Sequence, residues 1–216
     1  MSQQVIQLSS KRTDLLKQGR RLEYFTIAYN SLEALIAIAA GLLAGSIALI
    51  GFGFDSVIEI SSGAVLLWRL WADRDETDRE RIEALSLRLV GICFLALAFY
   101  VTYDSGFSLL RQQPVEKSIP GILLAITSLI VMPLLARAKR RVAFGIGSNA
   151  LAADARQTDF CTYLSAILLG GLLLNALLGW WWADPVAALL MVPIIVKEGV
   201  QALRGKSCGC SAGQCK

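Results

Sequence analysis

The 216-residue sequence contains no histidine. Without an imidazole, any metal site or proton relay must use carboxylates, amides, thiols or backbone carbonyls, and neither a Ser-His nor a metal-His hydrolase centre can be built. We therefore expect a protein that is not an enzyme. Cysteine is also scarce. The five cysteines are an odd number, far below the density of a disulfide-stapled secreted domain, and they argue against that class of protein.

Aromatic residues account for only 8% and charged residues for 18%, whereas 55% of the residues are hydrophobic and the mean hydropathy is +0.56. This composition suits helices packed closely in lipid and excludes both a water-soluble domain and a disordered chain. The formal net charge of +4 is spread over clusters of Lys and Arg between apolar segments. Such clustering indicates membrane topology, so we expect no nucleic-acid partner.

Six apolar segments are long enough to cross a hydrocarbon core about 30 Å thick, which needs roughly 20 helical residues. They are residues 23–44, 46–70, 87–109, 119–137, 144–178 and 184–203. No ten-residue alternating pattern indicates a barrel, so the segments are predicted to be helices. We predict an all-α membrane protein, a six-transmembrane-helix bundle whose fifth segment tilts or breaks near Gly145, Gly147 or Gly170-Gly171. Residues 1–22 would form an N-terminal tail, 23–204 the transport domain and 205–216 a Cys-containing tail.

The loops show a strong charge asymmetry. Lys and Arg gather before the first segment, after the second and fourth, and after the sixth, whereas the opposite loops hold only Arg111 and Lys117. The positive-inside rule therefore places both termini in the cytoplasm. Residues 1–22 have no apolar core with a cleavage site, so we expect no cleavable signal peptide. The protein is expected to be a multi-pass protein of the cell (plasma or inner) membrane, with Asp184 as the N-cap of its last helix.

Two carboxylates lie inside the second apolar segment. Asp55 and Glu59 are four residues apart and therefore share one helix face. A charge at the bilayer centre costs roughly 2.5–3.5 kcal/mol, and two neighbouring acids repel unless one is protonated or a cation lies between them. Because no Lys or Arg lies at similar depth in the first four segments to neutralise the pair, the pattern predicts a site that exchanges protons with a metal ion.

Polar side chains also line the fifth and first segments. At about 100° per residue, Asp154, Gln157, Thr158, Cys161 and Ser165 form one stripe, and all can donate lone pairs to a cation. Arg156 and Asp159 fall on the far side, where an ion pair between them is the simplest interpretation. Asn30 and Glu33 share a face of the first segment. Interhelical hydrogen bonding and a role in coupling both remain open for these two residues.

These features together resemble the cation diffusion facilitators, a family of six-helix, proton-coupled exporters of divalent metals. The resemblance covers about residues 25–204. Gly45-Ser46 leads to Asp55 and Glu59, which stand at the family's two ligand positions on the second helix. Ala153-Asp154 matches the start of its fifth-helix motif, and Ala183-Asp184-Pro185 matches the start of its sixth helix.

The fifth helix departs from the family pattern. The register set by Ala153-Asp154 places Gln157 where the family has His and Cys161 where it has Asp. A register shifted by two would use Ala155 and Asp159 instead. We favour the first, which gives a metal site of Asp55, Glu59, Asp154, Gln157 and Cys161. Asn30, Glu33 and Asp159 are then candidates for coupling or secondary roles.

The resemblance implies a divalent metal cation efflux transporter that works by proton antiport and alternating access, with no cofactor. Zn²⁺ is the first choice of cargo, and Fe²⁺, Mn²⁺, Co²⁺ and Cd²⁺ remain open. Only twelve residues follow Arg204, which resembles a short subgroup lacking the cytoplasmic domain, so we expect a homodimer formed through the membrane helices. Cys208, Cys210 and Cys215 are candidates for metal capture by the tail. A non-transporting metal-binding membrane subunit and an exporter of small organic cations are the alternatives.

Overall fold

Six helices make up the fold of the computed structural model, which describes residues 2–71, 76–112 and 115–204. They are α1 (Ser2–Ala44), α2 (Ile47–Trp71), α3 (Glu76–Arg111), α4 (Ile119–Ile146), α5 (Asn149–Leu178) and α6 (Ala183–Leu203). All six contain a stretch long and apolar enough to cross a membrane, and the described residues include no strand. The predicted six-helix, all-α fold is confirmed.

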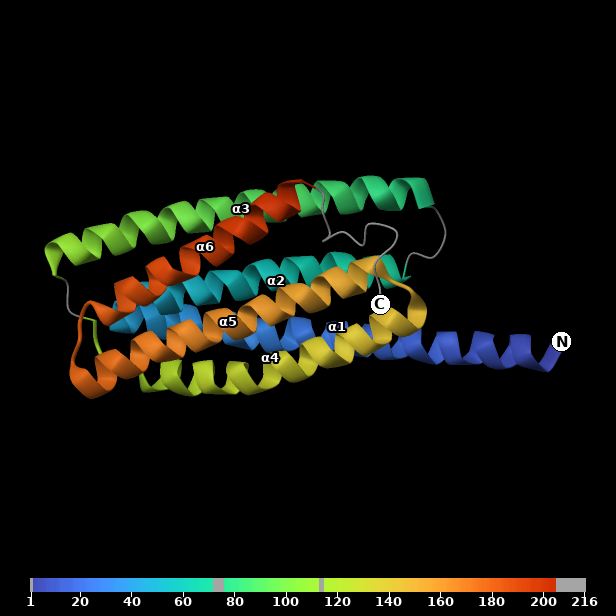
Figure 1. The fold of residues 1–216 in the computed structure, drawn as a ribbon, viewed down its shortest axis with the longest axis horizontal. Helices are drawn as coiled ribbons and strands as arrows, with labels where there is room; N and C mark the ends of the chain where they lie inside the picture. The colour runs from blue at the N-terminus through green and yellow to red at the C-terminus, as the bar shows by residue number, and fades with distance from the viewer. Residues whose placement is uncertain (1, 72–75, 113–114, 205–216) are drawn as a thin grey trace.

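Three close helix pairs build the bundle. α1 packs mainly against α2, α4 against α5, and α3 against α6. Figure 1 shows α3 and α6 together as one layer, next to a group formed by α1, α2, α4 and α5. At the crossing of α3 and α6, a Cβ added to Gly91 would lie 2.8 Å from the backbone oxygen of Gly199. Glycine at this point therefore permits the backbones to approach closely, as small residues do in membrane helix pairs.

The breaks between helices follow local sequence signals. Gly147 has a left-handed φ of 67° and ends α4, and the next residue, Ser148, accepts a hydrogen bond from the Leu151 N–H and caps α5. Residues 144–146 therefore belong to α4 and not to the predicted fifth segment. Helix α5 continues through Gly170-Gly171 without a break.

Two helices extend well beyond the predicted apolar segments. Helix α1 begins at Ser2, inside the predicted N-terminal tail, and α4 continues nine residues beyond 137 to Ile146. At 1.5 Å per residue, the 43 residues of α1 span about 64 Å, twice the hydrocarbon thickness. Hydropathy windows stop where charged residues begin, although the helical backbone does not.

The side chain of Asp184 corrects the prediction for the last helix. Its carboxylate accepts hydrogen bonds from the Ser46 hydroxyl and from the backbone N–H groups of Ile47 at 2.9 Å and Ala48 at 3.4 Å. Asp184 is fully buried, while Trp182 is the N-cap of α6 without a capping side chain. The carboxylate thus caps α2 instead of its own helix, and it ties the starts of α2 and α6 together.

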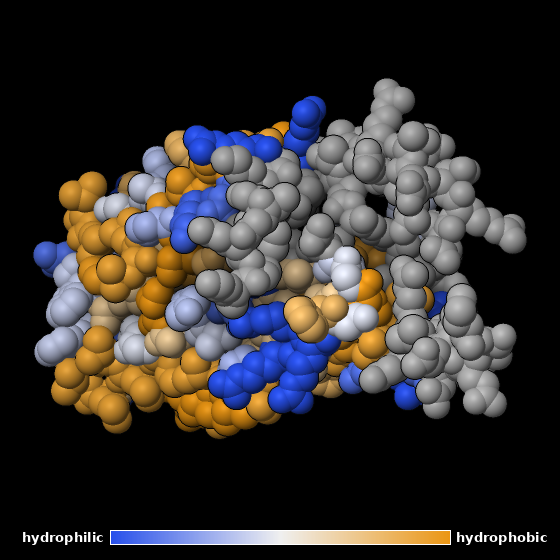
Figure 2. Space-filling model, turned by 45° about the vertical axis from the view of Figure 1, so that its right-hand side comes forward, coloured by the Kyte–Doolittle hydropathy of each residue, from blue (hydrophilic) through white to orange (hydrophobic). Residues whose placement is uncertain are grey.

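The outside of the bundle is largely apolar. Large hydrophobic side chains project outward from several helices, including Leu43, Phe99, Leu110, Phe144 and Leu177. Figure 2 shows broad hydrophobic surface along the bundle, interrupted by hydrophilic patches. The acidic side chains of α1 and α2 described below lie inside this surface, as expected of a bundle surrounded by lipid.

Candidate metal-binding site

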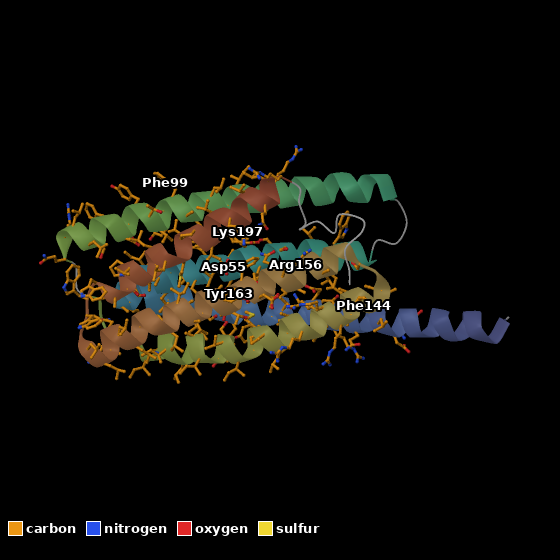
Figure 3. All side chains as sticks on the ribbon, in the orientation of Figure 1. Asp55, Phe99, Phe144, Arg156, Tyr163 and Lys197 are labelled. Atoms are coloured by element: carbon orange, nitrogen blue, oxygen red, sulfur yellow. The ribbon has the colours of Figure 1, made fainter. Side chains whose placement is uncertain are left out.

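Helices α2 and α5 bring two of the predicted ligands into contact in the interior. The Cys161 thiol donates a hydrogen bond to Asp55 Oδ2 over 2.9 Å. Asp55 is 4% exposed and Cys161 is 1% exposed, so neither side chain faces lipid. Figure 3 shows Asp55 inside the bundle, whereas Phe99 and Phe144 project outward. The polar stripe of α5 therefore faces the acidic face of α2, as the sequence predicted.

Glu59 lies one turn further along α2 and contacts α1. The Asn30 amide nitrogen donates a hydrogen bond to Glu59 Oε2 over 2.7 Å. Within the described residues, Glu59 Oε1 and Asn30 Oδ1 have no hydrogen-bond partner, although both atoms are buried. Glu59 also lies within interaction distance of Cys161. Asn30 thus orients the carboxylate of Glu59. One oxygen of each of the two side chains remains free of hydrogen bonds within the described residues.

Glu33 belongs to a polar layer between α1 and α2. The Ser56 hydroxyl donates a hydrogen bond to Glu33 Oε2 over 2.9 Å, and the Glu33 side chain is 1% exposed. Glu33 also interacts with Tyr29 and with Ser128 of α4. Because Ser56 directly follows Asp55, this layer is adjacent to the candidate site, and Glu33 interacts electrostatically with both Asp55 and Cys161.

Asp154 forms an ion pair with a buried lysine of α4. Its Oδ2 forms an ion pair with Lys139 Nζ, which also lies 3.3 Å from Glu23 Oε1. Lys139 and Glu23 are fully buried. From the sequence we expected no basic side chain at the depth of Asp55 and Glu59. Lys139 reaches the interior because α4 continues past 137, and its ion pairs are with Glu23 and Asp154.

The sequence did contain a signal for the burial of Lys139. The buried residues of α4 recur every three or four positions, through Met132, Leu135, Ala136, Lys139 and Val142. This spacing places Lys139 on the core-facing stripe of the helix. The hydropathy criterion assigned Lys139 to a loop because Arg137, Arg140 and Arg141 surround it in the sequence.

Asp159 lies apart from the Asp55–Cys161 contact and forms an ion pair with Arg140 of α4, in which the two side chains are 33% and 53% exposed. The register with Cys161 agrees with the geometry, because Cys161 and not Asp159 contacts Asp55. Gln157 is half-buried one turn before Cys161, and its Nε2 has no hydrogen-bond partner among the described residues.

Glu198 of α6 is a carboxylate that the sequence interpretation did not single out. Its Oε1 is buried without a hydrogen-bond partner in the described part of the chain, and the side chain interacts electrostatically with Asp55 and Arg156. The neighbouring Lys197 lies over the Phe160 ring of α5 at 5.8 Å, so this part of α6 faces the helix that carries Cys161. Figure 3 shows Lys197, Arg156 and Asp55 in the same region of the bundle.

Within the described residues, no three Asp, Glu or Cys side chains converge as ligands of one metal ion. Asp55 and Cys161 are already in contact, and Glu59 is turned toward Asn30. The tail residues Cys208, Cys210 and Cys215 lie outside the described residues.

Comparison with known protein families agrees with this arrangement. The model of the cation efflux transmembrane domain matches residues 24–206, which include most of the first candidate membrane span and all of the other five. The chain belongs to the cation efflux family. The resemblance to the cation diffusion facilitators is thereby confirmed, and the protein is an integral, multi-pass membrane protein.

Two curated proteins are similar to this cation efflux family member. The uncharacterized transporter sll1263 of Synechocystis is 26% identical over 177 residues, which cover 78% of this chain and 56% of the relative. The cation-efflux pump FieF of Shewanella oneidensis is 25% identical over 118 residues, which cover 55% of this chain and 40% of the pump. The matched regions thus span about half the length of these relatives.

Proposed function

We propose that this protein exports divalent cations in exchange for protons, and that the cation binds to Asp55, Glu59 and Cys161 between α2 and α5. The single observation that carries the proposal is the buried Asp55–Cys161 contact, with Glu59 one turn away. Membership of the cation efflux family and the similarity to a cation-efflux pump support a carrier over a non-transporting membrane subunit.

The chemistry of the three side chains explains why protons and a cation exclude one another. A carboxylate or thiol must be deprotonated before its lone pairs can bind a metal ion. Cation binding from the cytoplasm therefore releases protons, and reprotonation from the other side displaces the cation. The two carboxylates release up to about two protons per divalent cation, and the thiol releases one more when it binds the cation as a thiolate.

The ligand types guide the choice of cargo. A thiol beside two carboxylates fits Zn²⁺, and it also fits Cd²⁺, Co²⁺ and Fe²⁺ better than a site made of oxygen ligands alone. We propose Zn²⁺ as the physiological cargo, with Gln157 as an additional oxygen ligand one turn before Cys161. Asp154 is assigned to the ion pair with Lys139 and not to the cargo. A plasma or inner membrane location, cytoplasmic termini and a homodimer through the membrane helices stay predictions.

Transport into proteoliposomes tests the proposal. Purified protein is reconstituted, and the uptake of Zn²⁺, Mn²⁺, Co²⁺, Cd²⁺ and a small amine is followed with and without an imposed pH gradient. We expect uptake of divalent cations that rises with the gradient and is lost in Asp55→Asn and Glu59→Gln. Ser61→Ala is the control, because the Ser61 hydroxyl is exposed and donates its hydrogen bond to the carbonyl of Val57 in its own helix. Uptake that is indifferent to the gradient, or restricted to the amine, would contradict the proposal.

A further inference from the structure

A buried lysine lies between two carboxylates that come from two other helices. Lys139 Nζ of α4 lies 3.3 Å and 3.4 Å from the two carboxylate oxygens of Glu23 on α1, and it contacts Asp154 Oδ2 of α5. Lys139 and Glu23 are fully buried and Asp154 is 8% exposed. Glu23 Oε1 makes no hydrogen bond within the described residues, so the ammonium does not use all the capacity of this carboxylate.

This ion triad (Glu23, Lys139 and Asp154) continues the row of polar side chains that contains the candidate metal site. A Cβ on Gly63 would lie 3.3 Å from Glu23 Oε2, so the triad is adjacent to Gly63 of α2. Gly63 follows Asp55 by eight residues, or about 12 Å along the helix axis. Asp154 likewise precedes Cys161 by two turns of α5. Glu59 lies midway between Asp55 and Gly63 on α2, and it interacts electrostatically with Lys139 and Asp154.

The buried acidic side chains around Lys139 outnumber the buried basic ones. Glu23, Asp154 and Glu59 are three buried acids, and Lys139 is the only fully buried basic side chain among the described residues. Unpaired buried charge is costly, so removal of the ammonium would leave two carboxylates that must be neutralised, either by protonation or by another cation. Two carboxylates from different helices that enclose one buried cation have the composition of a cation-binding site.

We propose that Glu23 and Asp154 form a second cation site, which Lys139 fills permanently as a tethered cation. The lysine prevents a dissociable ion from binding there, so the Asp55–Glu59–Cys161 site alone exchanges its ion with the solution. Lys139 would thus be a positioning residue that limits the buried acids to one exchangeable divalent cation. The transport role of Lys139 rests on the proposed function, whereas the second site can be tested without it.

Counting bound Mn²⁺ tests the second site. Mn²⁺ prefers carboxylates to thiols, and the electron paramagnetic resonance signal of free Mn²⁺ reports how much is bound to the purified full-length chain. We expect Lys139→Met to bind about one more Mn²⁺ per chain than the wild type, because two carboxylates lose their cation. Lys139→Arg keeps the charge and should bind as the wild type does. The triple variant Lys139→Met, Glu23→Gln, Asp154→Asn removes both carboxylates and should also return to the wild-type count.

The same experiment in the Asp55→Asn background separates this proposal from the proposed function. Addition of Lys139→Met to Asp55→Asn should again add about one Mn²⁺, even if the wild type binds none. Wild-type protein that binds no metal would count against the proposed function alone. An unchanged count in folded Lys139→Met protein would overturn the second site.

A stability measurement covers the case in which Lys139→Met is too unstable to purify. Its thermal unfolding can be followed in crude detergent extracts by size-exclusion chromatography, with and without Mn²⁺. We expect Mn²⁺ to raise the apparent Tm of Lys139→Met more than that of the triple variant, since a ligand that binds only the folded state stabilises it. Equal shifts in the two variants would overturn the proposal.

Discussion

The Cys161 thiol on α5 donates a hydrogen bond to Asp55 on α2, 106 residues away in the sequence, in the interior of the bundle. The contact places one soft and one hard donor group side by side, with Glu59 one turn further along α2. Because ligand softness governs the choice between metals, Cys161 is expected to set the preference of the site and Asp55 its charge.

Replacement of the thiol by a hydroxyl tests this division of roles. Cys161→Ser should lower the affinity for Cd²⁺ by about tenfold more than the affinity for Mn²⁺, because Mn²⁺ gains little from sulfur. Isothermal titration with both ions measures the ratio. Cys93→Ser is the matched control, since Cys93 is an exposed residue of α3. Equal losses of affinity for the two ions would show that Cys161 is not a ligand.

The crossing of α5 and α6 gives a prediction about stability from two adjacent glycines. A Cβ on Gly171 would lie 2.5 Å from the Cβ of Ala187, whereas a Cβ on Gly170 would meet nothing within 4 Å. Gly171→Ala should therefore destabilise the protein by about 1–3 kcal/mol through overpacking. Gly170→Ala should be neutral or stabilise α5 by up to about 1 kcal/mol. Thermal unfolding in detergent compares the two, and equal Tm values would contradict the packing described here.

The capping of α2 by Asp184 predicts a specific loss of stability. Asp184→Ala removes the acceptor for the Ser46 hydroxyl and for two backbone N–H groups, and it should cost about 2 kcal/mol. Asp159→Ala is the control, because its ion pair with Arg140 is partly exposed and should contribute at most about 1 kcal/mol. Chemical denaturation of both variants measures the difference. A larger loss in Asp159→Ala would contradict the assignment of Asp184 as the cap.

The fold was predictable because every segment in lipid must satisfy its backbone hydrogen bonds internally, which a helix does. The six apolar windows and the acids inside them were visible from hydropathy and helical spacing alone. The contact of Asp55 with Cys161 was also predictable, since each residue lies on a polar stripe that must turn away from lipid. These predictions needed only the periodicity of single helices.

The parts that sequence reasoning missed depend on contacts between distant segments. Asp184 resembles a local N-cap, yet its partners lie about 137 residues earlier in α2. Lys139 has the local sequence of a loop residue, but its ion-pair partners are Glu23 and Asp154 on two other helices. Local propensity describes a residue within its own helix, and it does not reveal which side chains the bundle brings to that residue.

The most direct test of the central claim is the pH dependence of Zn²⁺ affinity in purified protein whose Cys208, Cys210 and Cys215 are replaced by Ser. If Asp55 and Glu59 exchange protons for the cation, Zn²⁺ affinity should fall by about tenfold to a hundredfold per pH unit in the acidic range, and it should be lost in the double variant Asp55→Asn, Glu59→Gln. A double variant that binds Zn²⁺ with the parent's affinity and pH dependence would contradict the claim.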